Sequence, residues 1–268
     1  MGNAGLPLKA DSVDDLLSRV GTVFRIFDRQ DSGCVSYGVR AGGSRFFIKV
    51  AVEKGTVPIL QNAARFYARV RHHLVPELIQ TVDLPESLAL IHQWVEGEVL
   101  YSPEFRGQQG RSDPRSAHFR FCRLPVGRIL DMLEALYRLH AYLESLGYVA
   151  VDFYDGCIIY DFKRHQVHFC DLDHYRPGPF VLADDRLPGS SRFMAPEEYS
   201  RGSLIDHRTN VYTMGAAAFV FLASGKRRRE RWTGPPALWE VARKAVSPDR
   251  GSRQKSVNQF FEEWLSCR

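Results

Sequence analysis

Apolar and polar residues alternate along three short runs near the start of the chain. These runs cover about residues 23–28, 34–40 and 45–50 and are rich in β-branched and aromatic side chains. Alternation of this kind is typical of strands that bury one face. Glycine-containing turns at 31–33 and 41–43 separate the runs, so the pattern predicts three consecutive antiparallel strands.

A helical spacing of apolar residues follows and then gives way to strands again. The helical pattern covers about residues 57–70, and strand-like runs recur at about 76–82 and 88–94. The pattern over residues 1–93 therefore predicts an N-terminal lobe made of a five-stranded antiparallel sheet and one helix.

The rest of the chain is predicted to be mainly helical, so the expected fold is α+β with two lobes. A glycine between acidic residues marks a predicted hinge at 94–98, and residues 99–268 form the second lobe. Within this lobe, residues 101–124 are rich in arginine, glycine, proline and serine and show no sustained periodicity. We expect a long loop or lid-like insertion there, with arginines that face a substrate.

An amphipathic pattern predicts a long helix over about residues 126–146. His140 lies on its apolar stripe, and we interpret it as a core histidine with a buried partner. Two short strands are predicted next, at 157–161 and 166–170, and each lies beside an acidic cluster. The two clusters are therefore expected at neighbouring strand ends.

The composition fits a globular protein and selects few functions. The chain has 268 residues, of which 44% are hydrophobic, and this is enough for a sizeable core. The longest uncharged apolar stretch, 214–223, is too short to span a bilayer, and no secretory signal is evident. The five cysteines lack the spacing of a zinc site or a disulfide framework. We expect a cytoplasmic protein with reduced cysteines and no membrane partner.

A net charge of +5 favours acidic partners in general. The densest basic run, 226–231, has five basic residues in six and is consistent either with a nucleic-acid or lipid patch or with a solvated loop. Ser224 and Gly225 form a helix stop before the run, and no aromatic residue interrupts it. We favour the solvated loop and do not expect nucleic acid as a partner.

Three charged residues occur in the order that phosphoryl transfer from ATP requires. Lys49 lies in a predicted strand, Asp152 follows about a hundred residues later, and Asp171 belongs to a second acidic cluster. The transfer needs a cation for the phosphates, a carboxylate that orients the attacking hydroxyl and a carboxylate that binds Mg²⁺. The order predicts a small kinase with ATP and Mg²⁺ as cofactors. Taken singly, these residues would be a solvent-facing lysine and two aspartates at turns.

The motifs around these residues resemble those of the protein-kinase-like superfamily, which includes protein kinases and antibiotic phosphotransferases. Residues 47–51 are similar to the V-A-I-K strand, which implies that Lys49 binds the α- and β-phosphates. Asp152 takes the place of the aspartate of H-R-D, and the implied role is to orient the acceptor hydroxyl. Residues 171–173 resemble D-F-G, which implies that Asp171 binds the metal and that Asp173 supports it.

The resemblance also implies a nucleotide site in the first lobe. Residues 28–35 retain only the last glycine and the valine of the phosphate-covering loop G-x-G-x-x-G-x-V. Gly33 would approach the phosphates and Val35 would pack on adenine. Backbone groups around Gln93 and Val95 would hydrogen-bond the adenine.

Two features depart from the family pattern. Cys157 stands five residues after Asp152, where the family has a metal-binding asparagine, and sulfur is a poor ligand for Mg²⁺. Asp155 is the alternative ligand nearby. The predicted helix over 57–70 also carries no glutamate to pair with Lys49.

The second half of the chain carries a further part of the resemblance. Residues 189–199 are similar to the protein-kinase segment that ends in A-P-E, and residues 209–215 are similar to the start of a central buried helix. The resemblance implies an ion pair between Glu197 and either Arg250 or Arg253. Two more helices are predicted after it, over about 236–246 and 256–266.

Three functions remain open at this point. The first is a Ser/Thr protein-kinase-like enzyme that moves the γ-phosphate of ATP to a hydroxyl-bearing protein. The second keeps the fold and the nucleotide but has a small-molecule acceptor, such as an antibiotic or a metabolite; Asp173, Tyr154 and the short second lobe favour it. The third is a pseudokinase or nucleotide-binding scaffold, which Cys157 motivates.

Overall fold

The computed structural model describes residues 5–29 and 32–268. The chain forms two compact units, residues 1–96 and 97–268, and the boundary falls inside the segment 94–98. Residues 30 and 31 belong to the predicted phosphate-covering loop and lie outside the described residues. The protein is α+β with a five-stranded antiparallel sheet, as the sequence predicts.

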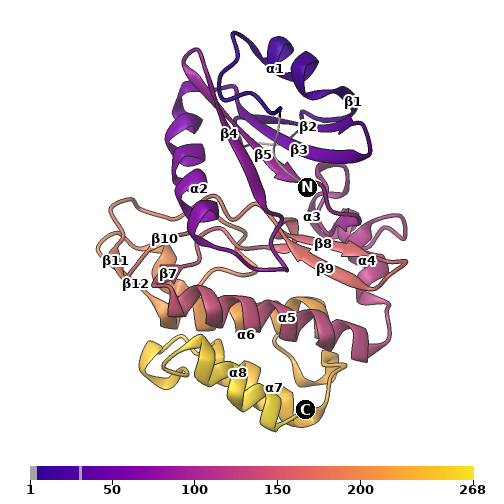
Figure 1. Cartoon of the computed structure of the whole chain (residues 1–268). Helices are drawn as coiled ribbons and strands as arrows, with labels where there is room; N and C mark the ends of the chain where they lie inside the picture. The colour runs from indigo at the N-terminus through magenta and orange to yellow at the C-terminus, as the bar shows by residue number, and fades with distance from the viewer. Residues whose placement is uncertain (1–4, 30–31) are drawn as a thin grey trace. The chain divides into compact units, whose positions relative to one another are not determined.

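The sheet of the first unit follows the alternating pattern closely (Figure 1). Its strands lie side by side in the order β1-β2-β3-β5-β4, and every neighbouring pair is antiparallel. Each strand begins and ends within two residues of its predicted bounds. The strands are β1 (Thr22–Phe27), β2 (Cys34–Ala41), β3 (Ser44–Ala51), β4 (Leu78–Leu84) and β5 (Ser87–Gln93).

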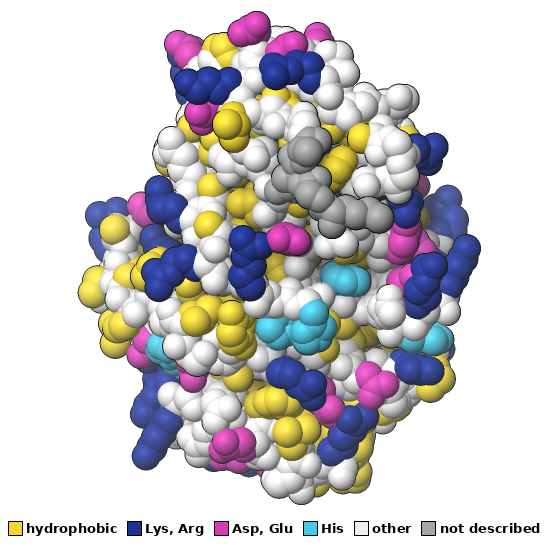
Figure 2. Space-filling model, viewed as in Figure 1, with side chains coloured by type: hydrophobic (Ala, Val, Ile, Leu, Met, Phe, Trp, Pro, Cys, Tyr) yellow, Lys and Arg dark blue, Asp and Glu magenta, His cyan; other side chains and the backbone are white. Residues whose placement is uncertain are grey.

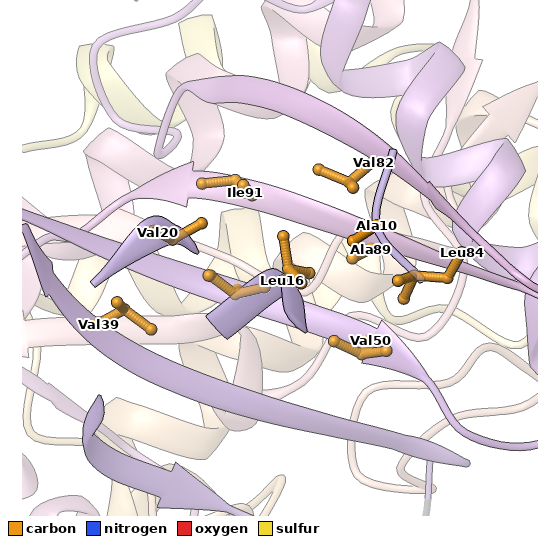
Figure 3. Packing of buried hydrophobic residues seen from close by; sticks show 10 residues of the cluster. Ala10, Leu16, Val20, Val39, Val50, Val82, Leu84, Ala89 and Ile91 are labelled. Carbon is orange, nitrogen blue, oxygen red and sulfur yellow. The ribbon is translucent and has the colours of Figure 1, made fainter. Parts of the chain in front are cut away.

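Two helices pack on opposite faces of this sheet. The predicted helix is α2 (Val57–Arg69), and its Tyr67 ring lies 4.7 Å from the ring of His92 on β5. Ile91 is the next residue along β5 and therefore points to the other face. There it belongs to a core cluster with residues of a second helix, α1 (Val13–Val20) (Figure 3).

Helix α1 was not predicted, although the sequence contains signals for it. The Ser12 hydroxyl caps the helix by accepting a hydrogen bond from the backbone N–H of Asp15 at 3.0 Å. Leu16 and Val20 are four residues apart and both are buried. The helix has only eight residues, so its apolar stripe contains too few positions to stand out as a period.

Four helices form the core of the second unit (Figure 1). The ring of Tyr137 on α5 lies 4.8 Å from that of Phe260 and 5.1 Å from that of Trp264, both on α8. Nearly every side chain of α6 is buried, which is typical of a central helix. The helices are α5 (Val126–Ser145), α6 (His207–Leu222), α7 (Pro236–Ala245) and α8 (Val257–Ser266), which confirms the predicted positions.

Short strands and turns lie between these helices and carry most of the candidate site. The predicted hairpin is present as β8 and β9. One short 3₁₀-helix follows Asp152, and another forms the end of the A-P-E-like segment. The short strands are β6 (Glu98–Val99), β7 (Tyr148–Val149), β8 (Ile158–Asp161), β9 (Gln166–Phe169), β10 (Arg176–Pro177), β11 (Phe180–Val181) and β12 (Leu204–Ile205). The 3₁₀-helices used below are η3 (Asp155–Cys157), η4 (Pro196–Tyr199) and η6 (Arg250–Ser252).

The insertion 101–124 is not the long loop that we expected. It contains a short 3₁₀-helix and two short helices, α3 (Gly107–Arg111) and α4 (Ala117–Cys122). His118 and Phe121 on α4 are buried. Helices of five and six residues are too short to show a period, which explains the difference.

The basic run 226–231 is exposed and follows the end of α6. Ser224 and Gly225 adopt left-handed conformations, which confirms the predicted helix stop. Figure 2 shows basic side chains spread over one face of the molecule and interspersed with acidic ones. Among the residues that the structure describes, no helix has the length and apolar character needed to cross a membrane.

Candidate functional site

Lys49 is buried in the middle of β3, with only 7% of the residue exposed. The register places it opposite Ser36 on β2 and Leu90 on β5. Its neighbours Ile48 and Val50 belong to the core cluster beneath α1, so Lys49 projects from the other face of the sheet. This burial excludes the simpler interpretation of a solvent-facing lysine, because a buried ammonium needs compensating groups.

The register corrects one predicted nucleotide contact. Val35 lies opposite Val50 and therefore shares the face covered by α1, whereas Lys49 lies on the opposite face. Val35 and Lys49 cannot contact the same nucleotide from this sheet, so the predicted adenine contact of Val35 is wrong. Ser36 is the residue beside Lys49, and its buried hydroxyl has no hydrogen-bond partner among the described residues.

The remaining predicted nucleotide contacts also lie in the first unit. Gly33 has a φ of 64°, and a Cβ there would lie 2.3 Å from the Thr56 hydroxyl, so the turn requires glycine for its own packing. The backbone N–H of Gln93 donates to the Glu77 carbonyl at 2.9 Å. Val95 is half-buried. The roles of Gly33, Gln93 and Val95 in nucleotide binding stay predictions.

In the second unit, Asp152 and Asp171 share an unusual backbone conformation. Their φ angles are 62° and 55°, in the left-handed region that few residues other than glycine adopt. Asparagine and aspartate tolerate this region best, but it still costs free energy, and such residues concentrate at functional sites. The two residues that the motifs single out are therefore held in special turns.

One buried thiol contacts both turns. The Sγ atom of Cys157 lies 3.5 Å from the carbonyl oxygen of Asp152 and 3.7 Å from that of Asp171. Cys157 is fully buried, and burial together with the nearby charges, first that of Asp171, raises the pKa of its thiol well above the ordinary value. The S–H group is thus a hydrogen-bond donor to the backbone, and Cys157 links the turns of Asp152 and Asp171.

Asp155 is also unavailable to a metal. One carboxylate oxygen lies 2.5 Å from Nη2 of Arg192, and the other lies 3.1 Å from Nδ1 of His118. Burial alone would raise the pKa of Asp155, but these two contacts outweigh it and hold the pKa below the ordinary value. The proposal that Asp155 replaces the missing asparagine ligand is therefore wrong. It instead joins the insertion to the A-P-E-like segment, a link that residues far apart in sequence could not reveal.

The predicted metal ligands differ in exposure. Asp171 is exposed, whereas Asp173 is 4% exposed. Within residues 5–29 and 32–268, no group of three or more histidine, cysteine or acidic side chains is placed to hold a metal ion. Mg²⁺ in phosphoryl-transfer sites binds one or two carboxylates, water and the phosphates of the substrate. An exposed Asp171 carboxylate suits that role, and the assignment stays a prediction.

The central helix and the A-P-E-like segment fix the chain around Asp152. The Asn210 side chain on α6 accepts a hydrogen bond at 3.0 Å from the backbone N–H of Ala150, two residues before Asp152. Glu197 forms two hydrogen bonds with Arg253, at 2.7 and 2.9 Å, and a longer one of 3.5 Å with Arg250. This confirms the expected ion pair and identifies Arg253 as its main partner.

His140 is a core histidine, as predicted. Its Nε2 lies 2.7 Å from the Tyr175 hydroxyl, and its Nδ1 lies 2.9 Å from the Leu136 carbonyl oxygen. Its ring also packs against Phe153, with the ring centres 5.1 Å apart. Burial lowers the pKa of His140 to about 4. Helix α5 thus supports the residue after Asp152 and the segment after Asp173 through one neutral imidazole.

The sequence was also compared with known proteins. No model of a protein family matches the chain, and no curated protein matches it. The function must therefore be argued from the residues and their geometry.

Proposed function

We propose that the protein is an ATP- and Mg²⁺-dependent phosphotransferase with a protein-kinase-like fold. The observation that carries this proposal is the arrangement in the second unit, where Cys157 binds the carbonyl groups of both Asp152 and Asp171 in their left-handed turns. This contact joins two residues nineteen positions apart in the chain. Phosphoryl transfer needs such a pair, because its catalysis rests on positioning and electrostatics.

Each residue has a defined role in this proposal. Asp152 accepts a hydrogen bond from the acceptor hydroxyl and orients it for attack on the γ-phosphate, and Asp171 binds Mg²⁺. Lys49 neutralises the α- and β-phosphates, and its burial supports this role because a buried ammonium interacts strongly with anions. Mg²⁺ would supply charge neutralisation at the phosphates. Ser/Thr residues of proteins are the first candidate acceptors, because residues 189–199 resemble a protein-kinase segment.

A small-molecule acceptor is the second candidate, and one contact favours it. The ring of Tyr101, at the start of the insertion, lies 5.6 Å from the ring of Tyr154, two residues beyond Asp152. The insertion also contains a surface hollow of about 580 Å³, lined by residues 106–109 and 112. The lining includes Arg106, Gln108, Gln109 and Ser112, whose side chains can hydrogen-bond an anionic or polyhydroxylated acceptor.

The test is transfer of labelled γ-phosphate from Mg²⁺-ATP into a host lysate, separated afterwards by a size filter. We expect Asp152→Asn to lower transfer by about a hundredfold or more, because it removes the acceptor of the hydroxyl proton while keeping the shape of the side chain. Label above the filter would identify a protein acceptor, and label below it a small molecule. Asp184→Asn, at an exposed aspartate, is the matched control and should transfer normally.

Two results would contradict the proposal. Full transfer by Asp152→Asn would remove the assigned role of that carboxylate. The absence of transfer by the unchanged protein, together with stabilisation by Mg²⁺-ATP in a thermal-shift assay, would favour the nucleotide-binding scaffold, because a ligand at a hundred times its Kd stabilises by about 2.7 kcal/mol.

A further inference from the structure

A small cavity in the second unit places a second acidic residue beside Asp152. The cavity has a volume of about 10 Å³, roughly the space of one water molecule. Asp152 and Glu198 are the titratable residues among those that line it. Its wall is completed by Ala150, Phe153, Phe193, Met194 and Thr213.

Glu198 lies in η4 and is 3% exposed. One of its carboxyl oxygens accepts a hydrogen bond from the backbone N–H of Ala195 at 2.5 Å. The neighbouring Glu197 forms the ion pair with Arg253, which donates to both of its carboxylate oxygens. The resemblance assigned the ion pair to Glu197 and gave Glu198 no role, because nothing in the sequence indicates that Glu198 is buried close to Asp152.

The charges around Glu198 disfavour its ionised form. Burial is the largest cause and raises its pKa, and the charges of Glu197 and Asp152 raise it further. The Ala195 N–H and the Arg253 charge act in the opposite direction, and the resulting pKa is about 8. Thr213 on α6 also lines the cavity; it carries no charge, and its hydroxyl donates to the Thr209 carbonyl at 3.3 Å.

We propose that Glu198 is a positioning residue for Asp152, and that its carboxyl group must be neutral to keep a second negative charge away from the small cavity that the two residues line. This inference rests on the proposed function, because it assigns Asp152 its role in transfer. When Glu198 loses its proton, two negatively charged residues line one small cavity, and their charges repel each other. Their repulsion favours proton uptake or displacement of Asp152, and either change removes the oriented acceptor for the attacking hydroxyl.

The first test is the pH profile of kcat/KM for phosphate transfer. The unchanged protein should lose about tenfold per pH unit above about pH 8 as Glu198 ionises. Glu198→Gln is neutral at every pH, and its amide oxygen can still accept from Ala195. It should transfer as well as the unchanged protein at pH 7 and lose this alkaline decline. Glu230→Gln, at an exposed glutamate, should keep the decline.

The second test needs no transfer. Between about pH 4.5 and 8 the folded protein keeps the Glu198 proton and the unfolded chain does not. This one group should therefore increase the equilibrium constant for unfolding about tenfold per pH unit over that range. The constant is measured by urea unfolding, and the contribution should be absent from Glu198→Gln.

The two tests together separate the possible failures. Equal pH dependence of unfolding in the two proteins would show that Glu198 is ionised in the fold and would overturn the inference. If Glu198→Gln loses the pH dependence of unfolding but keeps the alkaline decline in transfer, only the positioning role is overturned. If neither protein transfers phosphate at any pH, the proposed function fails, and the positioning role fails with it.

Discussion

Replacing Arg253 by methionine is expected to lower the free energy of unfolding by about 3–5 kcal/mol. The Arg253 side chain is fully buried, and its guanidinium binds both carboxylate oxygens of Glu197, at 2.7 and 2.9 Å. Methionine fills similar space but leaves the Glu197 carboxylate buried without its main partner. The cost is that of an uncompensated buried charge, which is larger than the net contribution of the pair itself.

Urea unfolding at constant pH measures this effect. Arg243→Met is the matched control, because Arg243 forms an ion pair with Glu240 while more than half of each side chain is exposed. We expect the control to change stability by less than about 1 kcal/mol. The double variant Glu197→Leu with Arg253→Met should be less destabilised than the sum of the single variants. A loss below 1 kcal/mol in Arg253→Met would mean that the pair does not hold the segment in place.

Acidification is expected to destabilise the protein through His140. Its pKa is about 4 in the fold and about 6.5 in an unfolded chain. Between these values the unfolded chain binds a proton that the folded protein does not, so stability falls as the pH falls. The loss amounts to about 1.4 kcal/mol per pH unit and about 3 kcal/mol in total.

The measurement compares urea unfolding of the unchanged protein and His140→Gln from pH 8 to pH 4. The stability of the unchanged protein should exceed that of the variant by a constant amount above pH 6.5, and the excess should shrink by about 3 kcal/mol at pH 4. Tyr175→Phe removes the hydroxyl but keeps the buried ring of His140, so it should show the acid loss of the unchanged protein. Parallel profiles for the unchanged protein and His140→Gln would contradict the assignment of a neutral buried imidazole.

The difference in stability between the unchanged protein and His140→Gln is the informative quantity, because Glu198 changes stability with pH in the opposite direction. Its pKa is raised to about 8, so its contribution to stability falls as the pH rises above about 4.5. From about pH 4.5 to 6.5 the two slopes nearly cancel. The pH dependence of the unchanged protein alone would therefore understate the contribution of His140 in this range.

The sheet and the long helices could be predicted because their signals are local. Alternation along β2 and β3 and the apolar stripe of α5 are visible within one window of sequence. Helices α1 and α4 were missed because eight and six residues do not establish a period. Their burial comes from partners elsewhere in the chain, which a local pattern does not encode.

The candidate site also combines features that the sequence shows locally with contacts that only the fold creates. The order of Lys49, Asp152 and Asp171 is a property of the sequence and was seen there. The ion pair of Asp155 with Arg192 joins residues 37 positions apart, and no pattern indicates it. The face of Val35 depends on a register in which an error of one residue reverses the direction of the side chain. Register is set by pairing across strands, so the motif alone could not show on which face of the sheet Val35 lies.

The segment before the sheet covers part of the outer edge of β4. Backbone hydrogen bonds join Ala10 N–H to the Asp83 carbonyl at 3.1 Å and Asp83 N–H to the Leu8 carbonyl at 3.0 Å, along the outer edge of β4. A shortened chain that begins at Thr22 would lose both this edge cover and the α1 side chains over Val50. It would expose an open strand edge beside an apolar sheet face, the combination that leads to intermolecular strand pairing. Aggregation of such a fragment would therefore say nothing about whether the sheet itself can form.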